Sequence, residues 1–246
     1  ENRVKSMKEC IDLMLVILPF EKEYFKNKWN WEVAYVGHPL VEETEAAIAR
    51  KQPGRIAEKP VVALLPGSRK QEISKKLPVM LAMSRRFPGY QFIVAKAPGT
   101  DESFYKEMLS AYPGVIYVQN RTYELLLQSE AALVTSGTAT LETALLGTPQ
   151  VVCYKGSPIT YQIAKRVIRV KFISLVNLIM DRAIVTELIQ HELNPENLEV
   201  ALKNILENKE SIRKMKEEYA QLKALLQQGG DASATAASLI SRFLNG

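Results

Sequence analysis

The sequence is poor in the residues that build disulfide frameworks and histidine metal sites. Only two cysteines and two histidines occur among its 246 residues. Cys10 and Cys153 lie in apolar segments without a CxxC pair, so we expect buried free thiols and a reducing compartment. Two histidines provide too few ligands for a histidine-based metal centre, and we expect none.

Long hydrophobic runs are also absent. No apolar stretch approaches the ~20 residues that a membrane-spanning helix needs. The first residues contain neither a signal-peptide core nor an initiator methionine, so we expect further chain before Glu1. A net charge of +5 permits a phosphate, nucleic-acid or anionic-lipid partner. No aromatic stacking platform or known binding motif accompanies the charge, and we expect no nucleic-acid partner.

The chain does contain a regular alternation of apolar strands and helices. Strands that are apolar throughout indicate a parallel sheet covered by helices on both faces, with ligands at the carboxyl ends of the strands. The expected strands cover 13–18, 32–36, 61–65, 90–95, 115–118, 131–134 and 150–154. The expected helices cover 3–11, 20–28, 71–86, 103–111, 122–129, 139–146 and 185–190, and a helix-rich tail follows from 195.

The most informative segment is 131–154, a strand, a polar turn, a helix and a second strand. Its turn carries Ser136, Gly137 and Thr138, and Glu142 follows one helical turn later. Unpaired N–H groups and the positive end of the helix dipole favour an anion there, and the carboxylate can reach sugar hydroxyls. A helix N-cap followed by a solvated acid would explain the same residues.

A second polar turn follows the expected strand 61–65. Gly67 lets backbone approach a ligand, and Arg69 offers a planar fork for phosphate oxygens beside Ser68. The alternative is a plain turn with a surface arginine paired to Glu72. Because both turns follow parallel strands, we expect them to face one pocket.

Two further features leave their interpretation open. Asn177 lies in an apolar run, where either a backbone partner or a ligand would satisfy its amide. The segment 155–172 mixes cations with apolar residues and contains no acid, which is typical of a membrane-interface segment or of an ordinary surface helix. The cations that we assign to a membrane or acyl-chain surface are Lys165, Arg166, Arg169 and Lys171.

Several motifs together resemble the lipid-A-disaccharide synthase family. They are VGHPL (36–40), LLPGSRKQEI (64–73), TSGTATLETALLGTPQVVCYK (135–155), and SLVNLI with VTELIQ within 174–190. The resemblance implies a GT-B type glycosyltransferase with two Rossmann-like domains. It implies a reaction between UDP-2,3-diacylglucosamine and 2,3-diacylglucosamine 1-phosphate, without metal or other cofactor. It also implies a cytoplasmic location on the inner face of the inner membrane.

The resemblance assigns a set of residues to the UDP-sugar donor. By match to the family's donor motifs these are Gly67, Ser68, Arg69, Ser136, Gly137, Thr138, Glu142, Asn177 and Gln190. The chain departs from the family at its start, where only 1–36 corresponds to the N-terminal, acceptor-side domain. A linker over 37–60 and a donor-binding domain with a helical tail over 61–246 complete the expected organisation. The catalytic base, an aspartate in the family, is therefore expected outside these residues and stays unknown.

Two other functions are compatible with the same turns. A UDP-N-acetylglucosamine 2-epimerase uses a similar fold and turn, although the basic and apolar segment 155–172 is foreign to a small soluble substrate. A non-catalytic nucleotide-sugar binding module is the third hypothesis, if the chain truly starts at Glu1. The apolar stripe of the C-terminal helices also suggests a homodimer that exchanges them.

Overall fold

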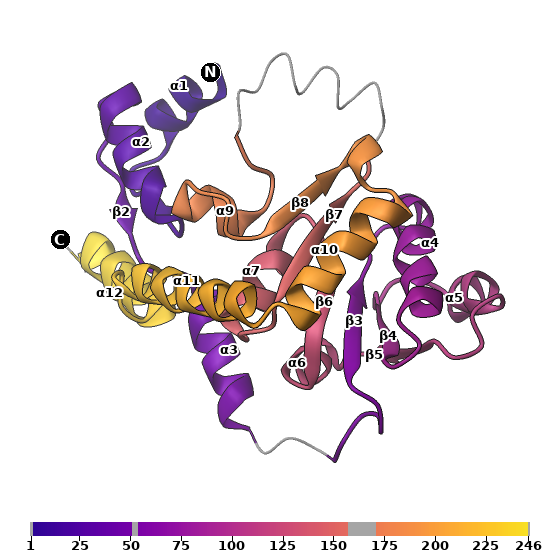
Figure 1. Cartoon of the computed structure of the whole chain (residues 1–246). Helices are drawn as coiled ribbons and strands as arrows, with labels where there is room; N and C mark the ends of the chain where they lie inside the picture. The colour runs from indigo at the N-terminus through magenta and orange to yellow at the C-terminus, as the bar shows by residue number, and fades with distance from the viewer. Residues whose placement is uncertain (1, 51–53, 157–170, 246) are drawn as a thin grey trace. The chain divides into compact units, whose positions relative to one another are not determined.

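The computed structural model describes residues 2–50, 54–156 and 171–245, which form two compact units. The sheet unit comprises residues 47–219, and the terminal unit comprises residues 1–46 and 220–246. Figure 1 labels most of the helices and strands of both units. The sheet unit contains both polar turns and therefore every candidate for the donor pocket that the sequence suggested.

A six-stranded parallel sheet forms the centre of the sheet unit, in the order β5-β4-β3-β6-β7-β8. The strands are β3 (Val61–Leu65), β4 (Gln91–Lys96), β5 (Ile116–Gln119), β6 (Ser129–Thr135), β7 (Gln150–Tyr154) and β8 (Thr186–Ile189). All five residues of β3 are buried, as a strand covered on both faces requires. The predicted α/β fold with a helix-covered parallel sheet is confirmed.

Helices cover the two faces of this sheet (Figure 1). They are α4 (Lys70–Arg86), α5 (Glu102–Leu109), α6 (Thr122–Leu127), α7 (Thr138–Leu145), α9 (Leu175–Met180) and α10 (Pro195–Glu207). Val61, Ala63 and Leu65 pack with Leu125 and Leu126 of α6 in one apolar cluster. Because side chains alternate along a strand, the other residues of β3 point to the opposite face, where α10 lies against β6 and β7.

The strand order reverses between β3 and β6. The chain passes from β3 outward to β4 and β5, then returns to β6 and continues outward on the other side to β7 and β8. In open parallel sheets, such a switch point leaves a crevice at the carboxyl ends of the two central strands. The two polar turns follow β3 and β6, so the topology places them on either side of this crevice.

The sequence interpretation is wrong at 185–190, which was expected to be helical. Residues Thr186–Ile189 form strand β8, paired in parallel with β7, and Gln190–Glu192 form a short 3-10 helix, η1. A short apolar run does not distinguish a strand from a helix by its periodicity. Residues 186–189 form a strand because they pair with the edge of β7, and the local sequence does not specify this pairing.

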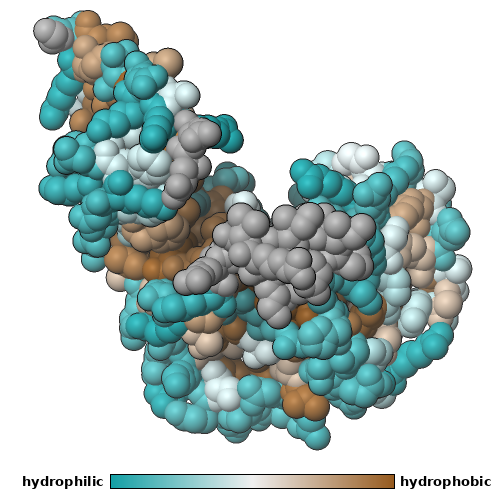
Figure 2. Space-filling model, turned by 90° about the horizontal axis from the view of Figure 1, so that it is seen from above, coloured by the Kyte–Doolittle hydropathy of each residue, from teal (hydrophilic) through white to brown (hydrophobic). Residues whose placement is uncertain are grey.

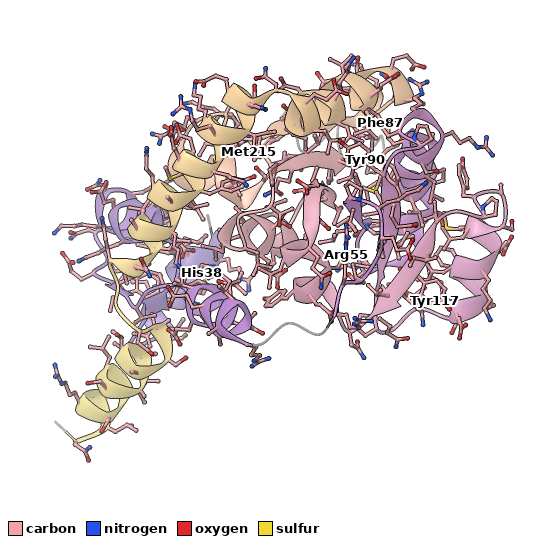
Figure 3. All side chains as sticks on the ribbon, turned by 60° about the horizontal axis from the view of Figure 1, so that its bottom comes forward. His38, Arg55, Phe87, Tyr90, Tyr117 and Met215 are labelled. Carbon is pink, nitrogen blue, oxygen red and sulfur yellow. The ribbon has the colours of Figure 1, made fainter. Side chains whose placement is uncertain are left out.

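Helix α4 continues through Pro78. Proline removes one N–H donor and crowds the preceding turn, yet the helix remains one element from Lys70 to Arg86. At its end, Phe87 and Tyr90 pack edge to face with ring centroids 6.4 Å apart in the loop that leads to β4 (Figure 3).

The terminal unit brings together segments from both ends of the sequence. It contains α1 (Asn2–Cys10), β1 (Leu15–Val16), α2 (Pro19–Trp29), β2 (Ala34–Tyr35) and α12 (Ala232–Asn245). Helices α3 (Pro39–Ala49) and α11 (Lys209–Gln227) each begin in one unit and end in the other.

Close contacts hold the two segments of the terminal unit together. A Cβ added to Gly229 would lie 2.1 Å from the backbone nitrogen of Gly37, so the two glycine backbones touch. The Tyr35 hydroxyl donates to the Leu226 carbonyl at 2.9 Å, and Ser233 donates to the Glu42 carboxylate. The sequence instead suggested boundaries at 36 and 60 and a tail grouped with the sheet. Those domain boundaries stay a prediction.

Two smaller points concern the surface and the cysteines. Hydrophilic residues occupy most of the face that Figure 2 shows, with apolar residues interspersed. Within residues 2–50, 54–156 and 171–245, no helix is both long and apolar enough to cross a membrane. Cys153 is buried as expected, but Cys10 is exposed near the end of α1, so the expectation of a buried thiol is wrong there.

Candidate functional site

A cavity of about 350 Å³ opens at the switch point of the sheet. Its volume lies within the range of small-molecule sites. The cavity is lined by Leu65, Gly67, Ser68, Glu72, Ala95, Lys96, Ala97, Pro98, Thr122, Thr135, Ser136, Gly137, Thr138, Ala139 and Glu142. Both polar turns therefore face one pocket, as the sequence predicted.

The first turn connects β3 to α4. Gly67 has a φ of +115°, a conformation that glycine adopts readily, and Ser68 lines the cavity beside it. Arg69 occupies the N-cap position of α4, with 82% of its side chain exposed, and pairs with Glu72 at 3.3 Å. The Arg69 side chain does not line the cavity in this arrangement, and a ligand there would compete with Glu72 for it.

The second turn connects β6 to α7. Gly137 has a φ of +137° and occupies the N-cap position, and no side chain of the described residues caps α7. The Ser136 hydroxyl donates instead to the Ile173 carbonyl at 2.7 Å. The simple N-cap explanation of Ser136 and Thr138 is therefore not realised. The helix N-terminus faces the cavity without a side-chain acceptor, an arrangement suited to an anion.

Glu142 lines the cavity one turn inside α7 and has an oriented carboxylate. The Tyr123 hydroxyl, from the start of α6, donates to its Oε1 atom at 2.7 Å. Its second carboxylate oxygen, Oε2, is available to accept a hydrogen bond from a hydroxyl in the cavity. Tyr123 was missed by sequence reasoning, because a single tyrosine nineteen residues away has no local signal that links it to Glu142.

Sequence reasoning also missed two buried lysines, one on the cavity wall and one behind it. Lys96, at the end of β4, lines the cavity and donates from Nζ to the Gln119 amide oxygen at 3.1 Å. Lys76, on α4, is 2% exposed and donates to the Thr135 hydroxyl. Lys76 follows Ile73 by three residues and precedes Leu77, so its position on the buried helical stripe was a signal that could have found it.

Asn177 lies in the interior rather than on the cavity wall. Its Oδ1 accepts the N–H groups of Ile184 at 2.8 Å and Val185 at 3.0 Å. Its Nδ2 donates to the Val185 carbonyl and to Glu187, both at 2.9 Å. Protein groups thus occupy the hydrogen-bonding positions of this amide, and its link to the cavity is indirect.

That link runs through the loop before α9. The Glu187 carboxylate also accepts the Ser174 hydroxyl at 2.6 Å and the N–H groups of Ile173 and Ser174 at 3.0 and 2.9 Å. The Ile173 carbonyl then receives the Ser136 hydroxyl. Asn177 and Glu187 therefore support the position of Ser136, which lines the cavity.

Gln190 begins η1 at the end of β8, with a φ of +56°. It is not among the cavity-lining residues, and its buried Nε2 has no hydrogen-bond partner among the described residues. The expected membrane-surface residues Lys165, Arg166 and Arg169 lie outside the described residues. Lys171 is exposed and pairs with Asp181 at 3.3 Å.

Comparison with known families identifies the chain. A sequence model of the family described as lipid-A-disaccharide synthetase matches residues 1–241. The chain belongs to this family. The resemblance carried by PGSR and SGTATLE is thereby confirmed.

Individual relatives agree with the family assignment. The lipid-A-disaccharide synthase of Syntrophus aciditrophicus is 37% identical over 246 residues, which cover 96% of this chain and 64% of that protein. That of Trichlorobacter lovleyi is 34% identical over 94% of this chain and 62% of its own length. The chain therefore spans less than two thirds of the curated relatives it matches first.

Solved structures place the chain in the GT-B fold class. The calicheamicin glycosyltransferase CalG4 superimposes with a TM-score of 0.58 at 17% identity, covering 98% of this chain and 56% of CalG4. A UDP-GlcNAc 2-epimerase from Neisseria meningitidis bound to UDP-GlcNAc gives 0.59 at 13% identity, covering 98% of this chain and 63% of the epimerase. At these identities the likeness concerns the fold alone.

Proposed function

We propose that this chain is the donor-binding part of a lipid A glycosyltransferase. The complete reaction joins UDP-2,3-diacylglucosamine to 2,3-diacylglucosamine 1-phosphate and yields lipid A disaccharide 1-phosphate and UDP. The observation that carries the proposal is the cavity at the switch point, formed by two glycine turns and the start of two helices, in a chain of this family.

The chemistry of the cavity fits a nucleotide diphosphate. Helix N–H groups at 137–138 and the Lys96 ammonium offer donors and positive charge to the departing diphosphate. Arg69 can join them by leaving Glu72, since both side chains are solvent-accessible. Glu142, oriented by Tyr123, provides an acceptor for sugar hydroxyls. These groups allow transfer chemistry in which protein donors, rather than a metal ion, balance the charge.

The proposed reaction also requires a site for the acceptor and a general base. The acceptor's 6-hydroxyl needs a base near the anomeric carbon, usually a carboxylate or histidine. The base is proposed to lie outside residues 1–246. An inner-membrane surface is proposed as the partner of the basic and apolar segment 155–172, and a homodimer through the C-terminal helices remains a separate proposal.

Calorimetric titration with UDP tests the donor site. We expect binding by the full chain, and a weaker affinity in the Arg69→Ala and Glu142→Ala variants. The exposed Arg213, which pairs with Glu210 and Glu217 on α11, offers a matched control: Arg213→Ala leaves UDP affinity unchanged. Unchanged affinity in both site variants would remove the site assignment.

Product analysis separates the proposed transferase from the epimerase alternative. Incubation with UDP-N-acetylglucosamine should give no 2-epimer, whether or not the remainder of the enzyme is present. Disaccharide should form from the two diacylated sugars only when a polypeptide supplying the acceptor-side residues is added. Formation of the epimer, or UDP binding without transfer in the completed enzyme, would contradict the proposed function.

A further inference from the structure

A buried lysine lies behind both turns of the cavity. The Lys76 side chain is 3% exposed, although long charged side chains are almost never buried without a partner. Its Nζ atom donates to the hydroxyl of Thr135 and lies 3.6 Å from Oε2 of Glu72. Lys76, Glu72 and Thr135 form a polar cluster that the proposed donor contacts do not use.

The cluster touches the backbone of the first turn. A Cβ added to Gly67 would lie 3.1 Å from Glu72 Oε2, 3.5 Å from Lys76 Nζ and 3.5 Å from Thr135 Cγ2. The ammonium therefore lies directly behind Gly67. Thr135 is the last residue of β6 and immediately precedes the second turn, so one side chain connects the two turns.

The charges around Lys76 leave its positive charge only partly compensated. Burial lowers its pKa, and the Glu72 carboxylate acts in the opposite direction. Glu72 also pairs with Arg69, so one carboxylate serves two cations. The Cys153 thiol of β7 is close enough to Lys76 to interact electrostatically, and burial raises the pKa of this thiol to about 12, which keeps it neutral. The three ionised groups thus carry one excess positive charge beside the cavity.

We propose that Lys76 is a positioning residue of the phosphate subsite, holding Thr135 and the turn 135–138 in place and supplying a fixed positive charge behind Gly67. This inference deepens the proposed function and rests on it. A charge already fixed in a buried site stabilises an anion without reorganisation when the anion arrives. Glu72 keeps that charge in place while the cavity is empty.

The first test compares UDP with uridine, which lacks phosphate. Lys76→Met keeps most of the length of the side chain and removes its charge. We expect the affinity for UDP to fall by about tenfold or more, because a unit charge in a site of low dielectric contributes at this scale. The affinity for uridine, measured by displacement, should stay within about twofold, since Lys76 does not line the cavity.

A double-mutant cycle tests whether Lys76 acts through Thr135. Thr135→Val retains the charge and removes the hydroxyl that Lys76 bonds. Thr135→Val alone should weaken UDP binding less than Lys76→Met does. In the Lys76→Met background, Thr135→Val should cause no further loss of UDP affinity. Independent sites would give additive losses. Additive losses here would overturn the coupling between Lys76 and the second turn.

The pH profile provides a readout that a purely structural lysine would not change. In Glu72→Gln the carboxylate that supports the protonated lysine is gone, so the pKa of Lys76 falls further. UDP affinity should then begin to decline at a lower pH than in the wild-type chain. If Lys76→Met does not fold, the pH profile of Glu72→Gln still tests whether the charge of Lys76 supports UDP binding. An unchanged profile in Glu72→Gln would overturn the inference.

The outcomes separate this inference from the proposed function. A wild-type chain that binds no UDP would overturn the proposed function and the inference together. A wild-type chain that binds UDP, with a folded Lys76→Met variant that binds UDP equally well, would overturn the inference alone. Equal losses for UDP and uridine in that variant would likewise show that Lys76 does not serve the phosphates.

Discussion

Replacing Asn177 by alanine should destabilise the fold more than it weakens donor binding. The Asn177 side chain is 1% exposed and satisfies two backbone N–H groups, of Ile184 and Val185, and one backbone carbonyl, of Val185. Asn177→Ala removes all three bonds and the contact to Glu187. The sequence left the role of this amide undecided, and the variant separates its structural from its ligand-binding interpretation.

The magnitude follows from the groups that lose their partners. A buried donor or acceptor left without a partner costs roughly 1–3 kcal/mol. Three such backbone groups, with some replacement by entering water, suggest a loss of about 3 kcal/mol in the free energy of unfolding. For a chain of this size, roughly 2–4 °C accompany each kcal/mol. The melting temperature should therefore fall by roughly 6–12 °C.

Thermal unfolding followed by circular dichroism measures this effect, and calorimetry with UDP accompanies it. Asn197→Ala provides a control, because Asn197 is an exposed asparagine on α10 whose amide donates to the Glu192 carbonyl. The control should change the melting temperature by no more than about 2 °C. An Asn177→Ala variant with the wild-type melting temperature and a large loss of UDP affinity would refute the structural interpretation.

Three other predictions concern glycine, tyrosine and histidine positions. In urea unfolding, Gly67→Ala should destabilise the chain more than Gly137→Ala does. Both backbones have a positive φ, which costs roughly 1–2 kcal/mol for alanine. Only at Gly67 would the added Cβ also crowd a neighbour, the Glu72 carboxylate. Equal losses would contradict this. Tyr123→Phe should weaken UDP binding about three- to tenfold in calorimetry with little change in stability, because Glu142 loses its orienting donor; unchanged affinity would refute that role. Burial lowers the pKa of His38 in the folded chain. The stability that neutral His38 provides is therefore complete above the pKa of this histidine in the unfolded chain, and it is lost as the pH falls. In urea unfolding, His38→Asn should reduce this loss of stability between roughly pH 7 and 5. An identical pH dependence in the variant would contradict the assignment.

The sequence predicted the central strands and their turns, but not the role of the buried histidine. His38, labelled in Figure 3, precedes a proline in the sequence, and its Nδ1 accepts the Leu40 N–H at 3.2 Å in the terminal unit. The runs 61–65 and 131–134 predicted buried strands because they are apolar throughout, and β3 and β6 confirm them. Parallel topology then predicted that their turns share one pocket.

The remaining parts of the site depend on contacts between distant residues. Lys76 and Lys96 carry charges that usually indicate a surface, and only the packing of α4 and β4 shows that both are buried. Glu187 gave no signal in a segment interpreted as helix, although it organises the loop that supports Ser136. Local secondary-structure propensity does not predict that β8 pairs with β7. That pairing determines where Glu187 lies.

The composition of the terminal unit affects how a ribosome-bound chain acquires its structure. Residues 47–219 form a continuous segment and can fold while synthesis continues, whereas 1–46 must wait for 220–246. At 5–20 residues per second, this delay is on the order of 10–40 s. During this interval the Glu42 carboxylate and the Gly37 backbone lack the partners that α12 and Gly229 later provide. Residues 1–46 are thus among the last of the described residues to reach their final contacts, although they are synthesised before the sheet unit.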